Sequence, residues 1–534
     1  MSRTARISRR AGVLATATAV VGALALVPAG GALAAPPANT CDARNNNTVA
    51  KALECIDADG AWEHLEALQA IADANGGNRA AGTEGYEDSV DYVVERLEAA
   101  GWNVTIDEFD FTFVGPSTLQ QLDPVNATYE TGPFTASGSG TVEGNVIPID
   151  IVLGQPNDTV VTSGCEASDY AGIDWSGDAD IALIQRGTCE FGIKAGLAEQ
   201  AGAEAVIIFN QGNTPERSGL IVGTLIGANT LPITIPVVGA SYEQGVALAQ
   251  AGSTARIVVP EPEERPQKNV IAELPGKNDD NVVMAGAHLD SVQAGPGIND
   301  NGSGSAALLE IAESLSKLKP ENTLRFAWWG AEESGLLGSQ AYVDELATMP
   351  GELDRIALYL NFDMVASPNF IYMVYDGDES SFEAPVVVPE GSIEIEDVFE
   401  SYFTSQGIPY DDAEFSGRSD YEAFILAGIP AGGLFTGAEV VKTEEQEAIW
   451  GGIAGEQYDQ CYHLACDTID NPSEEALDVN IDAMAFAILA FAYDTSVVNG
   501  VAGKNVPGGI SFPTPAGPEM TVGSGGGHEH GEVD

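Results

Sequence analysis

Basic residues are scarce in this sequence: 22 Lys and Arg stand against 80 Asp and Glu, a formal net charge of −58 over 534 residues. Nucleic-acid binding requires clustered Lys and Arg to offset phosphate charge, so we expect no nucleic-acid partner. A need for solubility would explain the acidity, and so would a salty or calcium-containing medium that screens the repulsion. Composition leaves both explanations open.

Two common catalytic signatures are missing. The sequence contains no G-x-S-x-G, the turn that carries the nucleophile of many serine hydrolases. It contains no H-E-x-x-H either, which excludes the zincin class of metallopeptidase, and we expect His528-Glu529-His530 to lie in a solvated tail. Beyond the N-terminal region, no stretch is long and apolar enough to span a bilayer.

The six cysteines include no C-x-x-C pair. Six cysteines permit many pairings, and only their proximity along the chain favours one set over another. An oxidising compartment would favour the formation of such bridges. The expected disulfides are Cys41–Cys55, Cys165–Cys189 and Cys461–Cys466.

Residues 1–34 have the pattern of a secretory signal. Arg3, Arg6, Arg9 and Arg10 precede an apolar run, and Ala32-Leu33-Ala34 fits a cleavage site of small residues, which favours removal over a membrane anchor. The paired arginines leave open whether export is of the twin-arginine or the general secretory type. We therefore expect a secreted, extracellular monomer with no membrane attachment after cleavage.

The length exceeds that of one ordinary core, so more than one domain is expected. An α/β pattern over 35–124 and 262–499 is interrupted at 125–261 by short strands rich in Val, Ile, Thr and Gly. From residue 500 the chain is rich in Pro and Gly, and 500–534 is expected to be a disordered tail. The predicted fold class is α/β, with a mixed, mostly parallel central sheet flanked by helices and a β-rich insert.

The chemistry is expected at one edge of this sheet. Segments 282–287 and 323–329 are apolar and predict buried parallel strands, and 303–318 between them has helical spacing. In such βαβ units, ligands lie beyond the carboxyl ends of the strands. Four metal-competent or catalytic side chains follow these strands: His288, Asp300, Glu332 and Glu333.

Histidine is also rare, and two of the five histidines, His288 and His463, lie in these polar loops. With Asp300, Glu333 and Asp363 they make a zinc-type set of imidazole and carboxylate ligands. Two histidines and three carboxylates suit two metal ions that share one carboxylate. A lone histidine is more often a satisfied side chain, and a glutamate pair alone suits a helix N-terminus. Only the joint arrangement at strand ends favours a metal site.

Five motifs in order resemble the secreted bacterial di-zinc aminopeptidases, the leucine-aminopeptidase-like metallopeptidases of clan MH, over about Leu65 to Leu489. The motifs are GAHLDSV…GINDNGSG, RFAWWGAEESGLLGS, LNFDM, GRSDY and CYH…C. The stretch ALIQRGTCEFGIKAGLAEQAGAEAVIIFNQ resembles a protease-associated (PA) domain. Such an insert would either shape substrate access or be purely structural.

The resemblance implies two zinc ions and a role for each matching residue. His288 and Asp363 would bind one ion, Glu333 and His463 the other, and Asp300 would bridge them. The other implied roles are a general base (Glu332), a residue that polarises the scissile carbonyl (Tyr462), a partner that orients His288 (Asp290), a residue near the substrate (Arg418), an apolar side-chain pocket (Met364, Gly417, Phe435), a bridge that fixes the loop (Cys461–Cys466), and a calcium pair (Asp478, Asp482). The Asp300–Asn301 peptide is often cis in this family.

The expected activity is hydrolysis of the first peptide bond of peptides or proteins, with a preference for large hydrophobic N-terminal residues. One alternative is another clan member, such as a carboxypeptidase or glutaminyl cyclase. A second is a catalytically inactive, receptor-like binding protein of the same layout. All five ligands and the base are present, which favours the enzyme.

Overall fold

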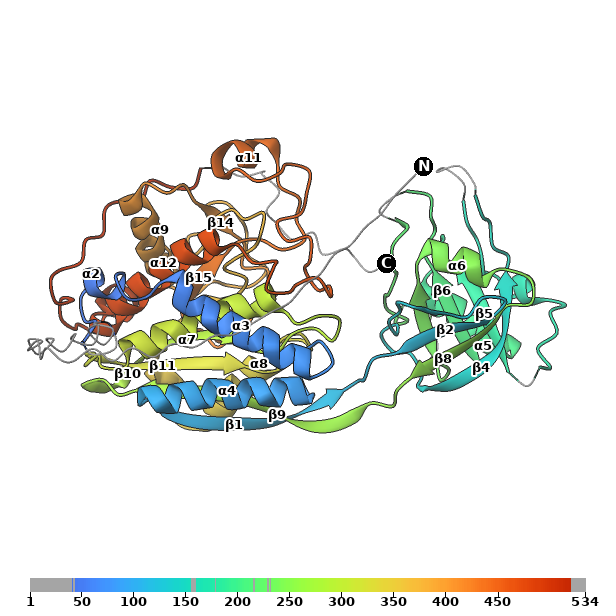
Figure 1. The fold of residues 1–534 in the computed structure, drawn as a ribbon, viewed down its shortest axis with the longest axis horizontal. Coiled ribbons are helices and arrows are strands. Elements are labelled where there is room, and N and C mark those ends of the chain that lie inside the picture. Colours follow the sequence, from blue (N-terminus) through green and yellow to red (C-terminus); the bar gives the residue numbers. More distant parts are fainter. Residues whose placement is uncertain are drawn as a thin grey trace, which may run out of the picture. The chain divides into compact units, whose positions relative to one another are not determined.

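The computed structural model describes residue 41 and residues 44–154, 160–177, 179–214, 217–227, 230 and 232–519. The expected signal at 1–34, like His528 and His530, lies outside these residues. The described chain forms two sheets: one of eight strands in the order β1-β9-β11-β10-β12-β15-β13-β14, and one of seven in the order β3-β2-β8-β4-β5-β6-β7 (Figure 1).

The larger sheet is mixed, which confirms the predicted fold class. Strands β11, β10, β12 and β15 run parallel to one another, because each is paired in parallel with its neighbour. At one edge, β9 is antiparallel to β11, and β1 is antiparallel to β9. The predicted strands 282–287 and 323–329 fall in β10 and β11. The strands are β1 (Asn103–Phe113), β9 (Glu263–Leu274), β10 (Asn278–His288), β11 (Asn322–Trp329), β12 (Ile356–Phe362), β13 (Met373–Tyr375), β14 (Asp411–Ala413) and β15 (Ala431–Phe435).

Helices cover both faces of this sheet. Alternate strand residues face two separate apolar cores, so that Val283 packs with the α3, α4, α7 and α12 side, whereas Met284 packs with the α8 and α10 side. The helices are α2 (Val49–Ala52), α3 (Ala58–Ala74), α4 (Glu84–Ala100), α7 (Gly304–Leu315), α8 (Leu337–Thr348), α9 (Ser392–Gln406), α10 (Tyr421–Leu426), α11 (Glu444–Trp450), α12 (Glu474–Tyr493) and α13 (Ser496–Asn499).

Helix α12 was not foreseen as a candidate membrane span. Among the described residues it is the one helix that length and composition would allow to cross a bilayer, and 83% of its most apolar window is buried inside the protein. That burial is typical of a core helix.

The chain leaves the larger sheet after β1 and returns to it in β9, and the smaller sheet forms in between. Strand β2 belongs to the smaller sheet, although it precedes the predicted insert boundary at residue 125. The elements are β2 (Thr118–Asp123), β3 (Ala127–Tyr129), β4 (Gly140–Ile149), β5 (Asp180–Gln185), α5 (Phe191–Ala201), β6 (Ala205–Phe209), β7 (Val237–Ala240), α6 (Tyr242–Leu248) and β8 (Thr254–Val259).

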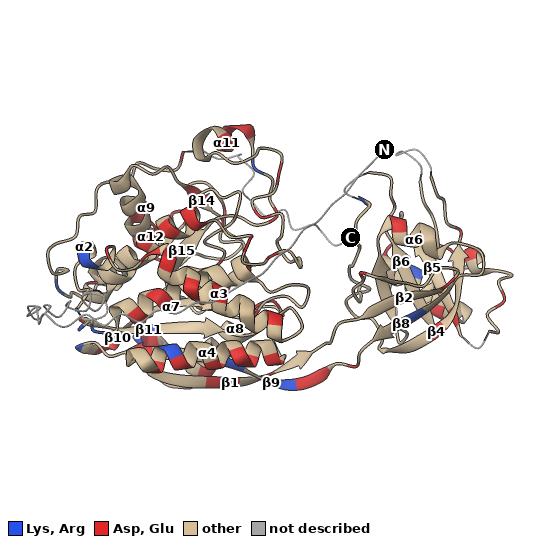
Figure 2. Cartoon of the chain, viewed as in Figure 1, with Lys and Arg blue, Asp and Glu red and all other residues tan. Residues whose placement is uncertain are grey.

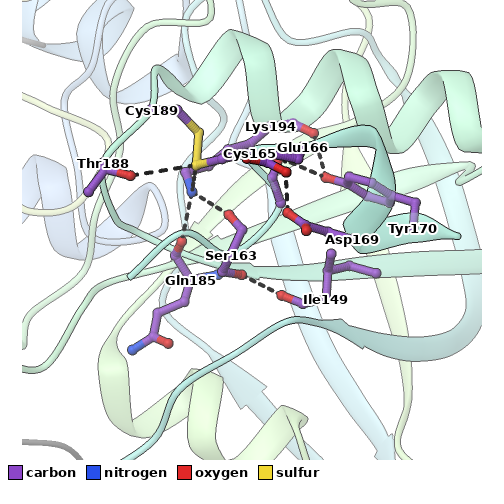
Figure 3. The surroundings of a disulfide bond; sticks show 11 residues. Ile149, Ser163, Cys165, Glu166, Asp169, Tyr170, Gln185, Thr188, Cys189 and Lys194 are labelled. Carbon is purple, nitrogen blue, oxygen red and sulfur yellow. Dashed lines mark hydrogen bonds between the residues drawn. A yellow bond between two sulfur atoms is a disulfide. The ribbon is translucent and has the colours of Figure 1, made fainter. Parts of the chain in front are cut away.

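A disulfide and a buried lysine organise one end of this insert (Figure 3). Cys165 is bonded to Cys189, as predicted. Lys194 of α5 is fully buried, and its Nζ donates to the carbonyl oxygens of Ser163 and Gln185 while lying 3.6 Å from the Cys165 Sγ. Burial lowers the pKa of Lys194 to about 8. The ammonium therefore links the loop before the disulfide to both α5 and β5.

The other cysteines are also oxidised. Cys461 is bonded to Cys466, as predicted. Cys41 and Cys55 are both in disulfide form, and no described cysteine is free. The pairing of Cys41 with Cys55 stays a prediction.

The expected disordered tail begins later than residue 500. Val506 is buried, the ring of Phe512 packs against that of Phe486, and the Gly517 amide donates to the Tyr410 hydroxyl. These contacts place 500–519 against the domain that contains the larger sheet. The prediction of a disordered tail is therefore wrong for residues 500–519. The reason is that a few apolar side chains pack against the rest of the protein, although the overall composition of this segment is rich in Pro and Gly.

Figure 2 shows the acidic excess on helices such as α4 and α11.

Candidate active site

A cavity of about 430 Å³ opens at the carboxyl ends of the larger sheet's central strands. His288 is the last residue of β10, Asp363 directly follows β12, and Phe435 ends β15. Eleven of the residues singled out from the sequence line this cavity: His288, Asp300, Glu332, Glu333, Asp363, Met364, Gly417, Arg418, Phe435, Tyr462 and His463. The chain thus brings residues from five separate loops to one place.

Two groups of metal-competent side chains share one carboxylate. Asp300 joins His288 and Asp363 in one group and Glu333 and His463 in the other, and the ligand atoms of each group lie within 4.8 Å of one another. The Nε2 of His288 is 3.3 Å from one Asp300 oxygen, and the Nε2 of His463 is 3.2 Å from the other. Glu332 belongs to neither group and lies at the edge, with its Oε2 4.0 Å from the His288 Nε2.

The electrostatics of this cluster suit a cation. Burial and the neighbouring Asp300 raise the pKa of Glu333 to about 7. Burial raises the pKa of Glu332 well above its usual value, and the nearby Asp363 adds to that effect. Among the described residues, Glu333 Oε1 and Asp363 Oδ1 are buried side-chain atoms without a hydrogen-bond partner. Buried carboxylates of this kind are stabilised by a metal ion, so the residues present fit a pair of divalent cations.

Asp290 holds three site residues rather than one. The His288 Nδ1 lies 3.1 Å from the Asp290 backbone oxygen and 3.6 Å from its carboxylate. The same carboxylate accepts the backbone N–H groups of Glu332 at 3.2 Å and Glu333 at 3.3 Å. Asp290 therefore sets the position of the glutamate pair as well as that of the imidazole.

Asp467 was not foreseen from the sequence. Its carboxylate accepts the backbone N–H groups of Asn299 at 2.8 Å and Asp300 at 3.0 Å, and its side chain is buried. The Asp300–Asn301 peptide that follows is cis, as the resemblance implies. The only sequence signal for Asp467 is its place next to Cys466 at the end of the disulfide loop.

Two further positioning residues were also missed. The Ser419 Oγ donates to Asp363 Oδ2 at 2.6 Å, and its place within GRSDY could have pointed to it. Arg79 is fully buried, and its guanidinium donates to the carbonyl oxygens of Leu289, Pro296 and Gly297. Arg79 therefore fixes the loop that carries Asp300. No local sequence pattern around residue 79 predicts that role.

The disulfide loop carries Tyr462 into the cavity. Arg418 donates one N–H to the Tyr462 hydroxyl at 3.1 Å and another to Glu439 at 2.7 Å. The Tyr462 ring stacks on that of His463, with ring centroids 3.8 Å apart. Arg418 therefore joins the loop that carries Tyr462 and His463 to Glu439.

The predicted calcium pair lies elsewhere, on α12. Asp478 accepts the Ala58 backbone N–H at 3.5 Å, and Asp482 accepts the Tyr402 hydroxyl at 3.5 Å. Within the described ranges, neither aspartate belongs to a group of three close metal-competent side chains. Calcium at this pair stays a prediction.

Comparisons with known proteins agree with the class of enzyme that this α/β fold and donor set define. The model of "Peptidase family M28" matches residues 269–488, and that of the "PA domain" matches residues 151–248. An aminopeptidase of Pseudomonas aeruginosa is 48% identical over 83% of this chain and 83% of its own length. Leucine aminopeptidase 2 of Trichophyton tonsurans is 41% identical over 80% of this chain and 83% of its own length.

A solved structure of an aminopeptidase is also similar to this chain. A zinc aminopeptidase from Bacillus subtilis matches with a TM-score of 0.59 and 26% identity, over 81% of this chain and 94% of that one. The chain belongs to peptidase family M28, with an inserted PA domain, and it is an aminopeptidase. The family resemblance inferred from the sequence motifs is thereby confirmed.

Proposed function

We propose that this protein is a secreted di-zinc aminopeptidase that removes large hydrophobic residues from the N-termini of peptides and proteins. The observation that carries the proposal is the pair of donor groups sharing Asp300, with Glu332 beside them, in a cavity that apolar side chains such as Met364 and Phe435 also line. Extracellular location is supported by the signal pattern at 1–34. The insert at 125–261, extended to include β2, is proposed as a separate PA domain.

His288 and Asp363 would hold one zinc ion, and Glu333 and His463 the other, with Asp300 bridging them. Zinc held by these residues would act as a Lewis acid and would lower the pKa of a nearby water toward ~7, so that hydroxide is available at neutral pH. Glu332 takes the proton of the attacking water and passes it to the leaving amine. The Glu332 side chain is 11% exposed and lies at the edge of the cluster without being part of it, which suits that role.

Tyr462 and Arg418 act on the developing oxyanion. Burial raises the pKa of the Tyr462 hydroxyl, which therefore stays protonated and can donate a hydrogen bond. Arg418 occupies that hydroxyl's acceptor side, since its N–H points at the Tyr462 oxygen. A donor held in this way stabilises the negative charge of the transition state with little reorganisation.

The first residue of the substrate is held at its free amine and at its side chain. Glu332 and Asp363 receive the free amine, which makes the enzyme an exopeptidase. The apolar wall of the cavity contains Met364, Phe435 and Tyr375, and it receives the first side chain. A leucine-sized preference is supported by the name of the Trichophyton relative, although one methylene discriminates by only ~1–3 kcal/mol.

The test compares leucine-p-nitroanilide with its N-acetylated form, before and after a chelator and after zinc is added back. We expect hydrolysis of the free-amine substrate only, its loss with chelator, and its recovery with zinc. Equal cleavage of both substrates would exclude an exopeptidase. Bound metal without cleavage of either would favour another clan member, and absence of both metal and cleavage would favour a binding protein.

Asp467→Asn should weaken metal binding without unfolding the site. The amide keeps the size of the carboxylate, but its NH₂ end cannot accept one of the two N–H bonds from Asn299 and Asp300. Loss of such an outer partner typically costs about 10–100-fold in metal affinity. Competition with a zinc indicator measures that affinity. Asp470→Asn, an exposed position in the same loop, is the matched control and should leave it unchanged.

A further inference from the structure

Three buried carboxylates outside the active site face one another. Glu396 and Glu400 lie one turn apart on α9, and Asp412 lies in β14. They are 4%, 7% and 2% exposed, and one ligand oxygen from each lies within 4.8 Å of the others. The strongest charged neighbours of Glu396 are all acidic, and they include Asp376 and Asp378. Burying like charges together is costly unless a cation or protons compensate.

Asp412 gives independent evidence for a missing partner. Its Oδ2 accepts the hydroxyl of Ser381 and, at 3.4 Å, that of Ser380. Its Oδ1 is a buried atom with no hydrogen-bond partner in the part of the chain that the structure describes. An unsatisfied carboxylate oxygen inside a protein costs more than a lost neutral hydrogen bond, so a ligand at this oxygen would be stabilising.

A neighbouring acidic group is a poorer candidate. Glu396 also forms a cluster with Asp376 and Asp378. The Asp376 carboxylate, however, already accepts three backbone N–H groups, from Ser380, Ser381 and Phe382. That arrangement is a satisfied turn, and it leaves less capacity for an ion.

We propose that Glu396, Glu400 and Asp412 bind one calcium ion, at a site separate from the catalytic centre. The donors are all carboxylate oxygens, which hard cations prefer, whereas zinc favours a set that includes nitrogen or sulfur. None of the three residues lines the catalytic cavity. The site is also distinct from the Asp478–Asp482 pair on α12.

The ion would brace one wall of the catalytic cavity. Asp412 directly precedes Ala413, and Ala413 lines that cavity. Glu396 accepts the backbone N–H groups of Gly377 and Asp378, just after Tyr375, which also lines it. The ion would therefore tie α9 to β14, while the Glu396 hydrogen bonds tie α9 to the segment that follows β13. Binding itself does not depend on the proposed peptidase mechanism.

The experiment measures calcium binding to the zinc-loaded enzyme after divalent ions have been removed and zinc restored. Calorimetric titration with calcium chloride gives the number of ions bound, and a thermal melt gives the shift in Tm. The test variant is Glu400→Gln with Asp412→Asn, and the matched control is Glu394→Gln with Asp397→Asn, two acidic residues of α9 outside the three-residue group. We expect the test variant to bind one calcium fewer than the wild type and to lose a calcium-dependent rise in Tm of about 5 °C.

The control variant should keep that ion and that rise. An unchanged number of calcium ions in the test variant overturns the proposal, as does a wild type that binds none. Burial raises the pKa of Glu396 to about 10 and that of Glu400 to about 7, so protons are the competing explanation. If the Tm did not change with calcium but rose as the pH fell below 7, protons rather than calcium would compensate the charge of the three carboxylates.

Terbium luminescence keeps the proposal testable if the double variant does not fold. Tyr410 is hydrogen-bonded to Glu400 and can sensitise terbium bound there. We expect emission that calcium displaces and that falls at least several-fold in Tyr410→Phe. Emission that is absent, or unchanged in that variant, overturns the proposal.

Discussion

Glu332→Gln should lower kcat for leucine-p-nitroanilide by about 10²–10⁴-fold while both metal ions remain bound. An amide cannot take a proton from the attacking water, and it is similar in size to the carboxylate that it replaces. The metal is expected to stay because Glu332 belongs to neither of the two donor groups around Asp300. Steady-state kinetics and elemental analysis of the same preparation measure both quantities.

Glu422→Gln is the matched control. Glu422 lines the same cavity but belongs to neither donor group. Its substitution should change kcat by less than about threefold. If Glu332→Gln lost zinc, its role would be that of a ligand. If it kept both zinc and full activity, another group would be the base, and the proposed mechanism would fail.

The larger domain was predictable because its signals are local. Apolar runs such as 282–287 and 323–329 end abruptly in polar residues, and parallel strands bring such ends to one edge. His288 ends β10 and Asp363 directly follows β12, so the strand predictions also placed both residues. Residue spacing alone could not assign His463, because its loop is held by a disulfide and packing rather than by a strand.

The supporting residues were not predictable for a physical reason. Arg79 and Asp467 act through hydrogen bonds to backbone groups of segments more than 160 residues away. Such long-range hydrogen bonds leave no periodic pattern in the sequence around either residue. Residues 500–519 were misjudged for the opposite reason, since their composition suggested disorder while single contacts by Val506 and Phe512 decided the outcome.

Asp300→Asn should abolish activity by loss of metal, with a decrease in kcat/KM of about 10³-fold or more, which corresponds to about 4 kcal/mol. Asp300 is the one carboxylate common to both donor groups, and its two oxygens point to the two histidines. An amide has a single acceptor oxygen and no charge, so it cannot bridge two cations. Elemental analysis after dialysis should find fewer than two zinc ions per chain.

Asp420→Asn is the control for Asp300→Asn. It removes a buried carboxylate near the site without removing the carboxylate that the two donor groups share. Asp420 is 1% exposed, and burial raises its pKa to about 7, yet it belongs to neither donor group. We expect it to keep both zinc ions and most of the activity. Equal loss of zinc in the two variants would mean that the charge of the whole cavity, rather than the bridging geometry of Asp300, holds the metal. Full occupancy in Asp300→Asn would refute the shared-carboxylate arrangement itself.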